Sequence, residues 1–129
     1  MNLHNYQHLN GISVDIIMPN YNKDKFIKDS INSVISQTYN NWNLIIIDDN
    51  SNDESKKIIS SYENDKIKKI YLSKNKGVAF CRNLGVRLSK SQYVAFIDSD
   101  DYWSSNKLKE QISFMDKNNY DFTYTNYIP

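Results

Sequence analysis

The chain is poor in the residues that mark several protein classes. Its 129 residues include a single cysteine, which rules out an internal disulfide framework and favours a reducing compartment. None of its three glycines forms a G-x-G or P-loop phosphate motif. With 16 Lys and Arg against 15 Asp and Glu, the net charge of +1 argues against nucleic acid or a membrane surface as the main partner. No apolar stretch approaches the roughly 18 residues of a membrane span.

What the chain does contain is enough apolar material for one core. Hydrophobic residues make up 40% and aromatic residues 13%, which at this length predicts one domain or one large subdomain. Residues 1–11 are polar, lack a signal-peptide pattern, and are expected to be a flexible leader in which His4 and His8 have no metal partners. The domain itself is predicted to span residues 12–129.

Short apolar runs predict strands. The run Leu44–Ile47 is continuously aliphatic, which is typical of a strand covered on both faces. Pro19 is expected to stop the first strand because proline cannot donate to a sheet ladder. The predicted strands are Ser13–Met18, Leu44–Ile47, Ile67–Leu72, Tyr93–Ile97 and a partial fifth strand, Phe122–Ile128.

Amphipathic stretches between these runs predict helices. One spans about Asp24–Gln37, and the next opens at Ser51–Glu54 with a Ser-x-x-Glu capping box. A third carries Cys81 on its apolar face, which makes that thiol a packing group rather than a nucleophile. The fourth is expected to be capped by Ser104 or Ser105. The alternation of strands and helices predicts an α/β fold, a mostly parallel Rossmann-like sheet with helices on both faces.

Polar residues follow each of the first four predicted strands. Because the carboxyl ends of parallel strands meet at one edge of a sheet, these segments are expected to converge on a ligand site there. They are Pro19–Asn22, Asp48–Ser51, Asn75–Gly77 and Asp98–Asp101.

The fourth-strand segment concentrates negative charge. Asp98, Asp100 and Asp101 lie within four residues, and carboxylates so close raise one another's pKa unless a cation neutralises them. Carboxylate oxygen is the ligand that Mg²⁺ and Mn²⁺ prefer. A solvated acidic turn that begins the next helix explains the same residues equally well. On spacing alone the two interpretations stay open.

The other strand ends carry weaker signals. Asp48 and Asp49 either form a plain turn or present a carboxylate to a nucleobase N–H or a ribose hydroxyl. Tyr21 offers a flat face to a base. Arg82, one turn inside the third helix, can reach a phosphate or remain solvated.

Five segments together resemble the nucleotide-sugar-binding half of an inverting family 2 glycosyltransferase with a GT-A fold. They occur in the family's order and spacing and cover about Ile12 to Leu108. They are Ile16–Asn22, Ser33–Tyr39, Leu44–Asp53, Asn75–Asn83 and Phe96–Asp101.

The resemblance implies roles for the matching positions. Pro19 and Tyr21 would line a nucleobase pocket, Asp49 would accept a hydrogen bond from the base, and Arg82 would lie near the phosphates. The donor would be a nucleotide-diphosphate sugar, expected to be a UDP-sugar.

The same resemblance identifies Asp98-Ser99-Asp100 as a DxD motif. It implies Asp100 as the main ligand of Mn²⁺ or Mg²⁺, with Asp98 near the ribose and able to share the metal. Asp101 would assist with the metal, and Ser99 would contact the nucleotide sugar. A dehalogenase-type phosphatase also uses D-x-D, but after its first strand and with a different following residue.

The implied activity is transfer of the sugar to an acceptor hydroxyl on a saccharide or a lipid-linked molecule. The setting implied is bacterial surface polysaccharide synthesis. The family usually carries its general base in an acceptor-binding half, so we expect that base beyond Pro129 and interpret the chain as part of a longer enzyme. The alternative is a donor-binding module without turnover. A cytoplasmic location is expected, with any attachment to the inner face of the plasma membrane being peripheral and made by regions outside this chain.

Overall fold

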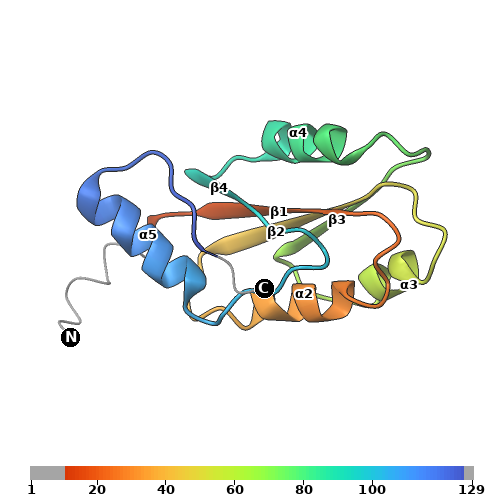
Figure 1. Ribbon diagram of the computed structural model, residues 1–129, viewed down its shortest axis with the longest axis horizontal. Coiled ribbons are helices and arrows are strands. Elements are labelled where there is room, and N and C mark those ends of the chain that lie inside the picture. Colours follow the sequence, from red (N-terminus) through yellow and green to blue (C-terminus); the bar gives the residue numbers. More distant parts are fainter. Residues whose placement is uncertain (1–10, 127–129) are drawn as a thin grey trace.

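A computed structural model describes residues 11–126, and its centre is a four-stranded sheet (Figure 1). The strands are β1 (Val14–Asn20), β2 (Trp42–Asp48), β3 (Ile67–Tyr71) and β4 (Tyr93–Phe96). All pairings are parallel and the spatial order is β3-β2-β1-β4. The predicted α/β fold with a parallel sheet is therefore confirmed.

Helices cover both faces of the sheet, as predicted. Figure 1 shows α2 (Ile27–Ile35), α3 (Ser55–Ser60) and α5 (Lys107–Asn118) on one side, and α4 (Val78–Leu88) alone on the other. Side chains alternate between the faces along a strand, so the two sides have separate cores. The larger core includes Ile16, Met18, Leu44 and Ile46, and the smaller one includes Ile17, Ile45, Ile47 and Cys81.

Pro19 does not stop the first strand, contrary to the prediction, because β1 runs on to Asn20 with Pro19 paired to Ile47. Successive residues of a strand point their backbone groups to alternate sides. The carbonyl of Asn20 accepts from Asp49 on the β2 side, so Pro19 faces the β4 side. The ladder between β1 and β4 has already ended there, at Ile17. A residue without an N–H therefore fits at this position.

The predicted helix caps are wrong. Helix α3 begins at Ser55, with no side-chain cap from Glu54, and the Ser51 hydroxyl is bonded to Asp48 instead. The N–H of Ser55 is satisfied by Asp53 Oδ1. Helix α5 begins after Asn106, again with no side-chain cap bond. The Ser51 hydroxyl, which the local sequence pattern assigned to a helix cap, forms hydrogen bonds with the buried side chains of Asp48 and Asn20 instead.

Two further predictions concern the two ends of the chain, which the structure describes only in part. Residues 122–126 of the predicted fifth strand form no strand, and the rest of that segment, with residues 1–10 of the predicted leader, lies outside the described residues. Within residues 11–126, none of the helices combines the length and the apolar character that a membrane span requires.

Asp15 ties the other end of β1 to the turn after α4. Its buried carboxylate accepts hydrogen bonds from the hydroxyls of Ser89 and Ser91, from the N–H groups of Lys90 and Ser91, and from the amide of Asn43. Burial acts to raise the pKa of Asp15, but these hydrogen bonds outweigh it and hold the pKa below its usual value. The C-terminal end of α4 is thereby fixed against the sheet.

Gly85 sets how closely α4 approaches the sheet. A Cβ atom added there would lie 2.5 Å from Cγ2 and 2.8 Å from Cγ1 of Ile17. Ile17 is fully buried in the middle of β1, where it packs within the smaller core. The absence of a side chain at position 85 therefore lets α4 lie directly against β1.

Gly85→Ala is expected to lower the free energy of unfolding by about 1–3 kcal/mol, because overpacking against Ile17 outweighs the better helix propensity of alanine. Urea denaturation measures the change. Asn83→Ala on the exposed side of α4 is the control and should be neutral or stabilising by about 0.5 kcal/mol. Equal effects of the two substitutions would show that the close contact does not constrain the helix.

Candidate functional site

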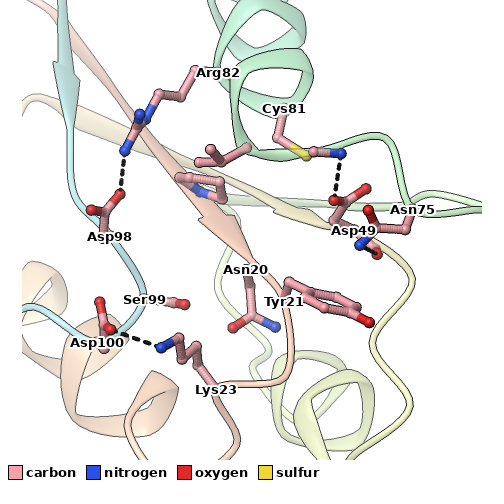
Figure 2. A pocket seen from close by; sticks show the side chains of 13 residues that line it. Asn20, Tyr21, Lys23, Asp49, Asn75, Cys81, Arg82, Asp98, Ser99 and Asp100 are labelled. Atoms are coloured by element: carbon pink, nitrogen blue, oxygen red, sulfur yellow. Dashed lines mark hydrogen bonds and ion pairs between the residues drawn. The ribbon is translucent and has the colours of Figure 1, made fainter.

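The ends of all four strands contribute to one pocket of about 450 Å³. This volume is in the range of small-molecule sites. In Figure 2, Asp98, Ser99 and Asp100 lie on one side, Asp49 and Asn75 lie on the other, and Asn20 and Tyr21 lie between them. The lining residues are Pro19, Asn20, Tyr21, Lys23, Asp49, Asn75, Gly77, Val78, Cys81, Arg82, Asp98, Ser99 and Asp100.

Asp48 holds two of these strand ends together beneath the pocket. Its fully buried carboxylate accepts hydrogen bonds from the Asn20 amide (2.8 Å), the Ser51 hydroxyl (2.7 Å) and the Ser51 N–H (2.9 Å). The Ser51 hydroxyl oxygen in turn accepts from the N–H of Asn22. Asp48 therefore acts as the plain turn residue that one interpretation of the sequence allowed.

Asp49 faces the pocket and also holds the loop after β3. Its two carboxylate oxygens accept the N–H groups of Lys76 (2.7 Å) and Gly77 (2.9 Å). Gly77 has a φ of 92°, a conformation that favours glycine, and it directly precedes α4. The Asn75 amide donates to the backbone carbonyl of Asp49. One side chain thus fixes the wall that leads into α4.

The opposite wall is charged and paired. Arg82 Nη2 lies 2.8 Å from Asp98 Oδ1, and Lys23 Nζ lies 3.0 Å from Asp100 Oδ2 (Figure 2). All four side chains are between 39% and 46% exposed, so solvent screens both pairs and leaves them open to exchange. Each of these two carboxylates on the opposite wall, Asp98 and Asp100, therefore has a cation that another ligand can displace.

Asp101 completes an acidic cluster with Asp98 and Asp100. One oxygen from each lies within 4.8 Å of the others. Burial, followed by repulsion from Asp98 and Asp100, raises the pKa of Asp101 above its usual value. The three residues that lie close together in the sequence are thus also close in space, where their negative charges repel one another.

This cluster fits a hard divalent cation. Its donors are all carboxylate oxygens, which Mg²⁺ and Mn²⁺ prefer over nitrogen or sulfur. Burial, followed by repulsion from Asp98 and Asp100, raises the pKa of Asp101, and a bound cation would relieve the repulsion. Asp98 and Asp100 also line the pocket, so a cation there would meet any ligand in it.

Cys81 lies under the pocket and is fully buried. Burial, followed by the negative charge of Asp49, raises the pKa of this thiol to about 11. A thiol of this kind is unreactive at neutral pH, because the thiolate is the nucleophile. The position and the pKa agree with the predicted packing role.

The sequence-predicted site residues Pro19, Tyr21, Asp49, Arg82, Asp98, Ser99 and Asp100 all line the pocket, and Asp101 lies beside it. Sequence reasoning included Asn20 and Asn75 in the segments expected at this site but assigned them no individual role, and it missed Lys23. Lys23 directly follows the polar segment after β1, so its place next to a strand end was a usable signal. The hydrogen bond of the buried Asn20 amide had no local signal, because its partner Asp48 lies 28 residues away.

The sequence matches the profile described as Glycosyl transferase family 2 over residues 15–128. That match covers most of the chain, including every residue that lines the pocket. The chain belongs to glycosyltransferase family 2.

Curated relatives agree with this assignment. The chain is 44% identical over 114 residues to WfgD of Escherichia coli, which is named a UDP-Glc:α-D-GlcNAc-diphosphoundecaprenol β-1,3-glucosyltransferase. The matched region covers 88% of this chain and 45% of WfgD. The chain is 39% identical over 116 residues to TuaG of Bacillus subtilis, which carries the name of a teichuronic acid biosynthesis glycosyltransferase, with 88% and 46% covered. The chain therefore spans about half the length of these relatives.

Solved structures show the same architecture. The crystal structure of S. aureus TarS 1–349 in complex with UDP matches with a TM-score of 0.78 and 29% identity, covering 84% of this chain and 33% of that one. The fold is the GT-A fold of glycosyltransferases.

The two hydrogen bonds of Asp49 to the loop after β3 predict a structural cost for Asp49→Asn. The amide would turn an N–H group toward one of two backbone donors, so the free energy of unfolding should fall by about 1–3 kcal/mol. Urea denaturation in the absence of ligand measures it. The control Asp65→Asn, which removes the same charge from an exposed position, should change stability by less than about 0.5 kcal/mol. A stable Asp49→Asn would show that the loop does not depend on this carboxylate.

Proposed function

We propose that this chain is the donor-binding part of an inverting glycosyltransferase that uses a UDP-sugar. The observation that carries the proposal is the pocket itself, in which an acidic cluster faces Tyr21 and Asp49 across the ends of β1, β2 and β4. The family assignment and the likeness to a UDP complex of TarS support it.

The nucleobase is proposed to lie between Tyr21 and Asp49. The Tyr21 side chain is 47% exposed and offers a ring face at the pocket, next to Pro19. A carboxylate has about four acceptor positions; on Asp49 the loop after β3 uses two, and the Cys81 thiol donates to a third. The remaining position suits a base that presents an N–H group, as uracil does.

The ribose and the phosphates are proposed to lie toward β4. Asp98 and Ser99 follow that strand, and Asp98 has acceptor oxygens suited to ribose hydroxyls. Arg82 is already held at this wall by Asp98, and its guanidinium has further N–H groups for phosphate oxygens. A diphosphate in this part of the pocket would lie beside the positive charge of Arg82, and the neighbouring carboxylates leave the wall net negative until a cation binds.

Asp100, with Asp98 and Asp101, is proposed to hold Mn²⁺ or Mg²⁺. When bound, such an ion supplies Lewis-acid stabilisation of the departing diphosphate, which is worth several kcal/mol. Arg82 adds a second positive charge on the same side. The chain's own contribution is to orient the donor and to collect positive charge where the leaving group develops negative charge.

The complete reaction is proposed to be transfer to a hydroxyl of a saccharide or lipid-linked acceptor during bacterial surface polysaccharide synthesis, at the cytoplasmic face of the plasma membrane. The name of WfgD supports a lipid-linked acceptor, and the name of TuaG supports polysaccharide synthesis. The general base that deprotonates the acceptor is proposed to lie outside residues 1–129. The carboxylates that line the pocket are assigned to the donor side.

The chain is expected to bind UDP, and to bind it at least about tenfold more tightly with Mn²⁺, since charge neutralisation of the acidic cluster is worth several kcal/mol. Asp100→Asn should remove most of that enhancement without unfolding the domain. Isothermal titration with UDP, with and without Mn²⁺, measures both quantities.

Asp65→Asn is the matched control for this experiment and should leave the Mn²⁺ enhancement unchanged, because the residue is exposed and does not line the pocket. GDP in place of UDP tests the base assignment. A Mn²⁺ enhancement that survives Asp100→Asn would contradict the assignment of Asp100 as the metal ligand. Equal affinity for UDP and GDP would contradict the assignment of the nucleobase as uracil.

Catalysis is tested with a labelled UDP-sugar and a lipid-linked saccharide acceptor. The chain alone should transfer sugar at least about 10²-fold more slowly than a version extended past Pro129, because general-base assistance contributes about that much or more. Equal transfer rates would place the base within these residues. An extended version that binds UDP but transfers nothing would favour the binding module instead.

A further inference from the structure

Lys23 occupies a position in the pocket that neither the family match nor the sequence motifs assign. It lies on the loop between β1 and α2, and its Nζ is 3.0 Å from Asp100 Oδ2. Its backbone carbonyl accepts the N–H groups of Phe26 and Ile27 at the start of α2. The backbone of Lys23 is thus fixed, while its side chain, 43% exposed, is free to change partner.

The charges around Lys23 are closely matched in number. Asp98, Asp100 and Asp101 bring three negative charges, and Lys23 and Arg82 bring two positive ones, which leaves one net negative charge at this wall. A diphosphate added to this arrangement would meet net repulsion. A divalent cation added to it would compete with Lys23 for Asp100, since both need the same carboxylate.

We infer that Lys23 is an exchangeable counter-ion that neutralises Asp100 in the empty pocket and moves to the donor diphosphate when a divalent cation binds the acidic cluster. The inference rests on the proposed function, because it takes the diphosphate and the cation from there. It adds a donor-binding residue and explains how the empty pocket limits its own repulsion.

The chemistry of lysine suits this exchange better than that of arginine. An ammonium group on a flexible four-carbon stem rotates to a new anion without a fixed fork geometry to satisfy. The pair with Asp100 is partly exposed, and such pairs are worth little, so a stronger anion readily displaces the carboxylate. A phosphate next to a cation-filled acidic cluster is such an anion.

Lys23→Met separates the two roles because it removes the charge and keeps a side chain of similar length. In the absence of nucleotide, Mn²⁺ should bind this variant about three- to tenfold more tightly, because its competitor for Asp100 is gone. In the presence of saturating Mn²⁺, UDP should bind about tenfold more weakly, because one charge-assisted hydrogen bond is lost. Isothermal titration measures both affinities.

Lys25→Met is the matched control, since Lys25 is exposed, lies two residues away on the same loop, and does not line the pocket. It should change neither affinity by more than about twofold. Lys23→Arg keeps the charge and should restore most of the UDP affinity. Thermal unfolding confirms that the variants are folded, and Lys23→Gln provides a second neutral variant should Lys23→Met not fold.

Opposite changes in the two affinities at position 23, absent at position 25, support the exchange. An Mn²⁺ affinity that is unchanged or lower, or a UDP affinity that is unchanged, overturns it even though the unsubstituted chain binds both ligands. Equal effects at positions 23 and 25 also overturn it, because they indicate a general effect of charge. Failure of the unsubstituted chain to bind UDP and Mn²⁺ instead overturns the proposed function, and the exchange with it.

Discussion

Two consecutive carboxylates at the end of β2 hold the pocket in shape. Burying a carboxylate is costly unless donors surround it, so each of these residues needs its hydrogen bonds. Asp48 collects its donors from Asn20 and Ser51, and Asp49 collects its donors from Lys76 and Gly77. Together they join the ends of β1 and β2 to the loop after β3. The positions of Asn20 and Gly77 at the pocket depend on these bonds.

The pocket is divided into two electrostatic regions. Around Asp49 the carboxylate is already committed to backbone N–H groups, which spreads its charge over fixed dipoles. Around Asp98 and Asp100 the carboxylates are held by partly exposed cations, Arg82 and Lys23. The first region therefore suits recognition of a neutral group by hydrogen bonds. The second suits ions that come and go.

The fold was largely predictable because strongly apolar runs have few alternatives. The runs around Leu44–Ile47 and Tyr93–Ile97 produced the predicted strands within a few residues, and parallel topology then brought their polar ends together. The site was predictable for the same reason, since a parallel sheet places all its carboxyl ends at one edge. The clustering of Asp98, Asp100 and Asp101 follows from sequence spacing alone.

Features that depend on contacts between distant segments escaped prediction. The Ser51 hydroxyl bonds to Asp48 and Asn20 rather than capping a helix, because buried donors and acceptors must be satisfied before exposed ones. Pro19 is tolerated inside β1 because the pairing of β1 with β4, the strand that Pro19 faces, has already ended at Ile17. The local sequence around Asp15, an apolar run, does not predict that this residue binds the turn after α4, because its partner Ser89 is 74 residues away.

The buried thiol beneath the pocket can report local opening of the structure. Cys81 is the one cysteine in the sequence, and it is enclosed between α4 and the sheet. With a pKa of about 11, roughly one molecule in ten thousand carries the thiolate at pH 7, even before shielding is considered. Because the Cys81 side chain is fully buried, an alkylating reagent reaches the sulfur only when the residues around it move apart. The rate of that reaction reports how often the packing around Cys81 opens at the base of the pocket, without a label or an engineered probe.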